Sequence, residues 1–302
     1  MEAALHCGEM IPHVIDIQSC SVLDMTVEVE AARDPVVLGS ARVLTNMLAQ
    51  ERTAEPARTD YCNTIQTSIA PHMRKIVTDW MLEVCQDHQC QPQVFFLAVN
   101  YLDRFLSSVA ISKTQFQLCA AVCILLASKF SQVVPISTEK LAVYTDHSVT
   151  TEELRLWEVQ VLAVLEWELS SVTAHSFLEQ LTSRAGLLGG QVSSRTLYSQ
   201  AETIAALAAT EYKFVLARQS VLAAAALAAA VRHQVQSPQV FLQTVKACAD
   251  LVRADITEII VCATHLLELP FVTSTAKRVD PEPARPLTPD DMLNISQTEI
   301  VV

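Results

Sequence analysis

Four charged side chains stand inside segments of the chain that are otherwise apolar. They are Arg74, Asp103, Lys129 and Glu158. Because a buried charge without a partner costs about 3–5 kcal/mol, charged groups in such places are usually paired. The pattern therefore predicts a helical bundle with an internal polar network.

Residues that could carry out catalysis are not grouped in a known pattern. The chain has no G-x-G-x-x-G, P-loop, G-x-S-x-G or H-E-x-x-H motif, and its 8 His show no metal-ligand spacing with Cys or carboxylates. We therefore expect no enzymatic activity, no cofactor and no metal.

Composition favours an all-α fold. Hydrophobic residues make up 51% of the 302 residues, and only 5 are Gly, so turn residues for a β-rich fold are few. A chain of this length can form two domains, each with its own core.

Charge and cysteine content restrict the partners and the compartment. The net charge of −12 opposes nucleic-acid binding, since phosphate contacts need a basic surface. No apolar run approaches the ~20 residues that cross a bilayer, and the first residues lack the basic region of a signal peptide. The 9 Cys are scattered without a C-x-x-C pair, which is typical of a reducing, intracellular compartment.

Apolar residues at helical spacing predict two sets of five helices. The first set is expected at 72–86, 93–107, 112–131, 137–146 and 151–167. The second is expected at 173–184, 193–214, 217–234, 238–249 and 255–268. The third helix of each set is rich in small residues, which would let several neighbours pack closely around it.

Local signals at helix ends refine this organisation. Asp34 and Pro35 predict the start of a helix at 34–49, with Asp as the cap and Pro in the first turn. Residues 51–61 are polar, and we interpret them as a connection. Thr150 and Glu153 have the spacing of a capping box.

Several motifs resemble those of a known family. MRKIVTDWMLEV, YLDRFLS, LLASKF and LWEVQVL are similar to the cyclin box, in order and at the expected spacing, over Met73–Trp167. PHMRKIV, WMLEVC, NYLDRFL and YTDH resemble the D-type cyclins in particular. The resemblance implies tandem five-helix cyclin folds after an N-terminal helix that packs across both. The predicted division is a flexible tail at 1–30, the first fold with its preceding helix at 31–172, the second fold at 173–270, and a disordered, Pro-rich acidic tail at 271–302.

The resemblance implies roles for the four charged residues. It places Lys129 and Glu158 where cyclins hydrogen-bond the regulatory helix of a kinase, with Phe130 as an apolar anchor beside them. An ordinary intramolecular salt bridge is the alternative. Arg74 and Asp103 correspond to an internal ion pair that ties the first helix of the fold to the second.

Both tails carry short motifs. Leu5, Cys7 and Glu9 fit L-x-C-x-E, and alternate residues of an extended strand can enter one groove together. In D-type cyclins this motif binds the pocket of the retinoblastoma protein; an idle tail is the alternative. Thr288 precedes Pro289 and resembles the phosphorylated threonine that controls nuclear export and ubiquitin-dependent destruction.

The resemblance also implies a groove that docks R-x-L peptides of substrates and of Cip/Kip-type kinase inhibitors. An apolar cleft with an acidic rim suits a peptide that presents one Arg and one Leu. The alternative is that the apolar members are simply core residues of an amphipathic helix. The groove residues are Met73, Ile76, Val77, Trp80, Glu83 and Gln117.

Taken together, the sequence predicts the activating subunit of a G1-phase cyclin-dependent kinase, acting on retinoblastoma-family proteins in the nucleus and cytoplasm. A transcription regulator with tandem cyclin folds is the second interpretation. The acidic charge and the pair of Lys129 and Glu158 argue against it.

Overall fold

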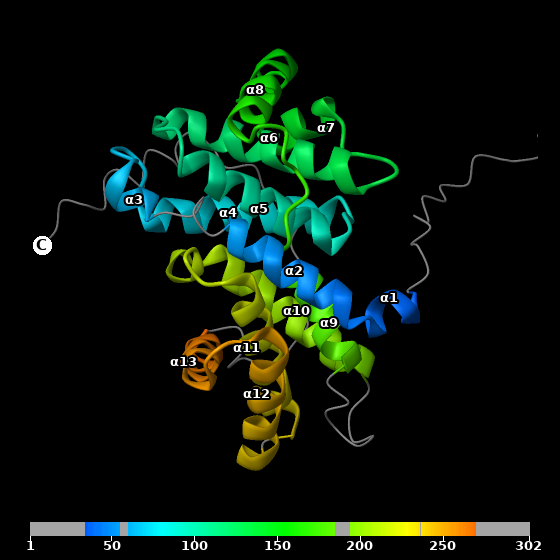
Figure 1. The fold of residues 1–302 in the computed structure, drawn as a ribbon. Helices are drawn as coiled ribbons and strands as arrows, with labels where there is room; N and C mark the ends of the chain where they lie inside the picture. Colours follow the sequence, from blue (N-terminus) through cyan, green and yellow to red (C-terminus); the bar gives the residue numbers. More distant parts are fainter. Residues whose placement is uncertain (1–33, 55–59, 185–193, 236, 270–302) are drawn as a thin grey trace, which may run out of the picture. The chain divides into compact units, whose positions relative to one another are not determined.

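The computed structural model describes residues 34–54, 60–184, 194–235 and 237–269. All regular elements in these segments are helical (Figure 1), as the composition predicts. Leu5, Cys7, Glu9 and Thr288 lie outside the described residues.

The first set of helices follows the predicted positions closely. The five predicted helices begin and end within a few residues of the expected bounds. They are α4 (Pro71–Asp87), α5 (Pro92–Leu106), α6 (Lys113–Ser131), α7 (Thr138–Tyr144) and α8 (Thr151–Val164). A short helix, α3 (Tyr61–Thr64), precedes them.

The second set repeats this plan. The helix expected at 193–214 ends at Thr210 and is followed by a short 3-10 turn. The members are α9 (Ala174–Arg184), α10 (Ser194–Thr210), η3 (Tyr212–Phe214), α11 (Gln219–Val235), α12 (Pro238–Val252) and α13 (Ile256–Leu267).

Small side chains allow one helix to form the centre of each repeat. In the first repeat α6 packs against α4, α5 and α8, and in the second α11 packs against α9, α10, α12 and α13 (Figure 1). The run Ala223–Ala230 of α11 is fully buried. Ala and Cys side chains let backbones approach closely, so a single helix can contact several neighbours.

Local sequence sets the ends of many helices. Pro71, Pro92 and Pro238 stand in the first turn, where the missing N–H is not needed. The capping box is confirmed: the N–H of Glu153 donates to Thr150 Oγ1 (3.2 Å), and the N–H of Thr150 donates to Glu153 Oε2 (2.9 Å). The Thr150 hydroxyl donates to the same carboxylate oxygen (2.8 Å), and the two bonds from Thr150 to the carboxylate lower the pKa of Glu153.

The N-terminal helix differs from the prediction. Two helices replace the single one expected at 34–49: α1 (Pro35–Gly39) and α2 (Ala41–Ala54). The chain is extended at Ser40 (ψ 114°), and the guanidinium of Arg184 on α9 donates to the Ser40 carbonyl. This tertiary contact satisfies a carbonyl at the end of α1. The helices pack on α9 and α11 of the second repeat.

The interpretation of residues 51–61 as a polar connection is wrong at its start. Glu51 belongs to α2 and is buried. Its carboxylate accepts hydrogen bonds from the N–H (2.7 Å) and hydroxyl (2.6 Å) of Ser220 at the start of α11. A carboxylate is stabilised at a helix N-terminus by the unpaired N–H groups there, so Glu51 connects α2 to the central helix of the second repeat.

Candidate functional site

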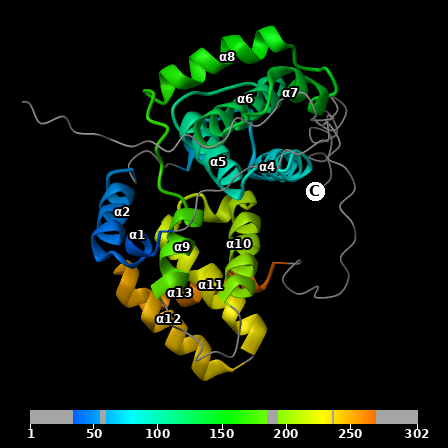
Figure 2. The same cartoon turned by 90° about the vertical axis from the view of Figure 1, so that its right-hand side faces the viewer.

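Lys129 and Glu158 form an ion pair at the surface of the first repeat. Lys129 lies in the last turn of α6, and Glu158 lies in the middle of α8, which runs along the outer side of α6 and α7 (Figure 2). The distance from Lys129 Nζ to Glu158 Oε1 is 2.6 Å, and the side chains are 45% and 17% exposed. The intramolecular salt bridge, which the sequence left as an alternative, is therefore present, and both side chains are partly exposed.

Exposed apolar side chains accompany this ion pair. They belong to the end of α6, the segment after it and α8, and we call them, with Lys129 and Glu158, the α6/α8 face. The apolar members are Phe130, Val133, Val134, Leu156 and Val159. Exposed apolar residues on the same helices as an accessible charged pair are typical of protein interaction surfaces.

Sequence reasoning found Phe130 and missed the other apolar members. On α8 the buried stripe contains Leu154, Val161 and Leu162. Leu156 and Val159 lie outside that stripe. Apolar residues on two faces of one helix could therefore have predicted that some of them are exposed.

Trp167 is another exposed aromatic residue that the sequence analysis assigned to a helix. It is 71% exposed and follows the end of α8. Glu166 and Trp167 have φ values of 54° and 61°, a conformation that is uncommon for residues with side chains. The next residues are held by α5: Arg104 Nη1 donates to the Glu168 carbonyl (2.8 Å), and the Tyr101 hydroxyl donates to the Leu169 carbonyl (2.7 Å).

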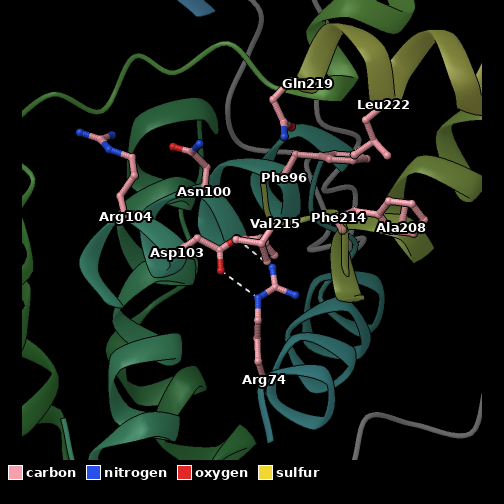
Figure 3. A pocket seen from close by; sticks show the side chains of 12 residues that line it. Arg74, Phe96, Asn100, Asp103, Arg104, Ala208, Phe214, Val215, Gln219 and Leu222 are labelled. Atoms are coloured by element: carbon pink, nitrogen blue, oxygen red, sulfur yellow. Dashed lines mark hydrogen bonds and ion pairs between the residues drawn. The ribbon is translucent and has the colours of Figure 1, made fainter. Parts of the chain in front are cut away.

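Arg74 and Asp103 form a buried ion pair between α4 and α5. The Nε and Nη2 atoms of Arg74 donate to the two carboxylate oxygens of Asp103, each at 2.8 Å (Figure 3). The hydroxyl of Tyr61 also donates to Asp103 (2.9 Å). Burial alone would lower the pKa of Arg74, but the adjacent Asp103 carboxylate outweighs it, and the net shift is upward.

Arg74 also binds the second repeat, a contact that the sequence did not indicate. Its Nη1 donates to the carbonyl of Thr210 at the end of α10 (3.0 Å), and Thr78 Oγ1 donates to the same carbonyl (3.2 Å). Lys75 pairs with Glu211 (2.9 Å). The end of α10 is thus attached to α4 by both charged and neutral hydrogen bonds.

Tyr212 adds a second attachment between the repeats. Its hydroxyl donates to Asp60 Oδ1 (2.7 Å) and accepts from the N–H of Cys62 (3.1 Å). Its ring packs edge-on against that of Tyr61, with centroids 5.4 Å apart.

A small cavity lies between α4 and α5 on one side and α10 and α11 on the other (Figure 3). Its volume is about 40 Å³, and Arg74, Asp103, Asn100 and Gln219 contribute its polar wall. This volume leaves room for water-sized groups only. The cavity is separate from the predicted peptide groove.

The predicted groove residues lie in or near α4. Met73, Val77 and Trp80 are almost fully buried, Ile76 is partly buried, and Glu83 is exposed. The three buried side chains are therefore core residues of an amphipathic helix, which the sequence left as the alternative to a peptide groove.

Two buried donors next to this segment have no partner among the described residues. They are Trp80 Nε1 and Nε2 of Gln117, which lies on α6. The other end of the Gln117 amide accepts from the Ser148 hydroxyl at 3.4 Å. Buried donors are nearly always satisfied, so these two are exceptions within the first repeat.

The described segments also lack a metal-binding cluster. They contain no group of three His, Cys, Asp or Glu residues placed to hold a metal. The helix α6 is long and apolar enough to cross a membrane by composition alone. It is mostly buried in the first repeat, and central helices of globular domains meet the same criterion.

Comparison with known proteins agrees with this architecture. The family "Cyclin, N-terminal domain" matches residues 42–170, and "Cyclin, C-terminal domain" matches residues 172–281. The solved structure of a viral cyclin from herpesvirus saimiri superposes with a TM-score of 0.62 at 24% identity, covering 73% of this chain and 94% of that one. The fold is therefore that of a tandem cyclin.

Sequence relatives narrow the family. G1/S-specific cyclin-D3 of Bos taurus is 45% identical over 202 residues, 67% of this chain and 68% of the relative. G1/S-specific cyclin-D2 of Rattus norvegicus is 40% identical over 210 residues, 70% and 72% of the two chains. The chain belongs to the D-type, G1/S-specific branch of the cyclin family, and is thus a regulatory subunit of a cyclin-dependent kinase.

Proposed function

We propose that this cyclin activates a G1-phase Ser/Thr kinase by binding the kinase's regulatory helix with the α6/α8 face. One observation carries the proposal: Lys129 and Glu158 form an accessible ion pair, and the residues that follow them in the chain, Phe130 and Val159, are exposed apolar side chains. The chain would supply this binding surface and no catalytic group of its own.

The physical logic is that of an interface with an apolar centre and a polar pair. Desolvating Phe130 and Val159 against a partner helix would supply affinity, since apolar burial contributes about 25 cal/mol per Å². Lys129 and Glu158 would offer a donor and an acceptor to backbone groups at the end of that helix. Binding would then complete the Lys–Glu–Mg²⁺ arrangement in the kinase active site.

The first experiment compares two ion pairs of equal length. The double variant Lys129→Ala/Glu158→Ala is tested beside Arg218→Ala/Glu258→Ala, whose pair also measures 2.6 Å but lies in the second repeat. We expect the first variant to weaken binding to a purified G1 kinase about 10-fold or more, and the control to change it little. Removing one surface pair costs ~0–1 kcal/mol of fold stability, so both should stay folded. Equal loss in both variants would contradict the assignment.

We further propose that retinoblastoma-family proteins are the substrates. Leu5, Cys7 and Glu9 would recruit the substrate pocket and raise its effective concentration near the kinase. A triple alanine variant at these positions is expected to keep kinase activity on a short peptide and to lose most of its advantage on the intact retinoblastoma protein. Loss of activity on both substrates would indicate a folding defect, and loss on neither would exclude the motif.

The α4 segment would dock R-x-L peptides of substrates and of Cip/Kip-type inhibitors. Exposed Glu83 supports this, because its carboxylate suits the arginine of such a peptide. Thr288, once phosphorylated, would direct export and a ubiquitin ligase, so the protein would occupy nucleus and cytoplasm. If no kinase bound, the transcription-regulator interpretation would become the leading one.

A further inference from the structure

Two cysteines meet where α4 ends. The helix stops at Asp87, and the chain reverses through Gln89, whose φ of 55° is left-handed. The N–H of Cys90 donates to the carbonyl of Cys85 (2.8 Å), and the N–H of Gln89 donates to the carbonyl of Gln86 (3.0 Å). This is the Schellman arrangement, in which the side chains of the outer bonded residues commonly touch.

In this turn the two touching side chains are thiols. Cys85 is 4% exposed, Cys90 is partly exposed, and neither is in a disulfide. A hydrogen bond with Cys90, together with burial, raises the pKa of the Cys85 thiol well above its ordinary value. Cys90 therefore reaches solvent in part, whereas Cys85 is shielded within the fold.

The other described cysteines lack this combination. Cys119 and Cys123 hydrogen-bond each other on α6 but are fully buried. Cys62 is partly exposed, and its neighbour is the hydroxyl of Tyr212 instead of a thiol. Within the described segments, only the α4 turn unites contact between two sulfurs with access from solvent.

We propose that Cys85 and Cys90 form a reversible dithiol–disulfide pair that is oxidised by hydrogen peroxide. The Cys90 thiolate attacks one peroxide oxygen, the O–O bond breaks, and a sulfenic acid forms while the released hydroxide takes a proton to become water. The Cys85 sulfur then attacks the Cys90 sulfur. The S–O bond breaks, the Cys85 proton leaves with the hydroxyl as a second water, and the S–S bond forms. Two electrons pass from the thiols to the peroxide, and a dithiol reductant reverses the step.

The consequence is a covalent fastening of the turn between α4 and α5. Tyr144 of α7 already holds this turn, since its hydroxyl donates to Asp87 Oδ2 (2.7 Å). The bond would remove the freedom of the α4 end to fray. This inference concerns the cyclin chain itself and does not depend on the kinase assignment.

Mass spectrometry of the purified full chain tests the proposal. The chain is treated with hydrogen peroxide or dithiothreitol, alkylated and digested. Trypsin leaves both cysteines in one peptide, Ile76–Arg104. After peroxide this peptide should lose two hydrogen atoms and take up no alkyl group. Cleavage at Asp87 should then yield two fragments that separate only on reduction.

Matched variants distinguish this pair from the others. Cys62→Ser and Cys119→Ser should still form the bond, whereas Cys90→Ser should abolish it with an unchanged circular dichroism spectrum. Oxidation should accelerate as pH rises, because the attack on peroxide needs the Cys90 sulfur as a thiolate. Full alkylation of both cysteines after peroxide would overturn the proposal. So would oxidation of Cys90 that stops at sulfinic acid, or a disulfide that persists in Cys90→Ser.

Discussion

Charged side chains in apolar helices meet two different environments in this cyclin. Arg74 is shielded from water, Asp103 is mostly buried, and each is satisfied by several hydrogen bonds. Lys129 and Glu158 form a shorter contact, yet solvent screens it. The burial of Arg74, more than the distance between the charged atoms, gives the first pair its larger expected contribution to stability.

Asp103→Asn tests the buried pair. The change leaves the Arg74 guanidinium buried without its counterion, so we expect a loss of about 3–5 kcal/mol in the free energy of unfolding, measured by chemical denaturation. Asp79→Asn is the control, because the Lys75–Asp79 pair is about half exposed and should cost ~0–1 kcal/mol. Similar losses in the two variants would show that the buried pair has no special weight.

At the scale of helices, two kinds of contact stabilise helix N-termini: caps from nearby residues and contacts from residues far away in the chain. Thr150 and Glu153 begin α8 through bonds between residues three positions apart. The start of α11 instead relies on Glu51, 169 positions earlier in the chain. Only the first kind of cap is visible as a sequence motif.

The capping box makes a prediction about pH. The pKa of Glu153 is lower in the folded state than in the unfolded state, so its stabilisation is present above the unfolded pKa of about 4.3 and is lost as pH falls through the folded pKa. Thr150→Ala should cost ~1 kcal/mol at neutral pH, and less in acid. Urea titrations of this variant and of Thr151→Ala across that range provide the measurement. A deficit that is constant with pH would contradict the role of the carboxylate.

At the scale of the whole described chain, the two repeats are joined through the segment that follows α10. Thr210, Glu211 and Tyr212 each contact the first repeat through α4 or the residues just before it. The contacts are polar and directional, so they fix how the end of α10 meets α4.

Tyr212→Phe removes the hydroxyl that links Asp60 and the N–H of Cys62 while keeping the ring. We expect faster hydrogen exchange around Cys62 and Tyr212, with the cores of α6 and α11 unchanged. Tyr198→Phe, on α10 but bonded to His175 within the second repeat, is the matched control. Unaltered exchange at Cys62 would show that the hydroxyl does not couple the repeats.

The sequence by itself determined the helices, the family and the residues that carry paired charges. Periodicity placed the ten long helices of the two repeats because apolar spacing, Pro and capping residues act within a few positions of the chain. The resemblance identified Lys129, Glu158, Arg74 and Asp103, and the structure brings each predicted pair within hydrogen-bonding distance.

Tertiary structure alone decided exposure and long-range contact. Trp80 and Phe130 are both aromatic residues of amphipathic helices, yet one is buried and the other is exposed, depending on what packs over them. The break at Ser40, the buried Glu51 and the Tyr212–Asp60 bond all depend on partners more than a hundred residues away. Local sequence holds no signal for such pairs, because their energy arises only when folding excludes water from between them.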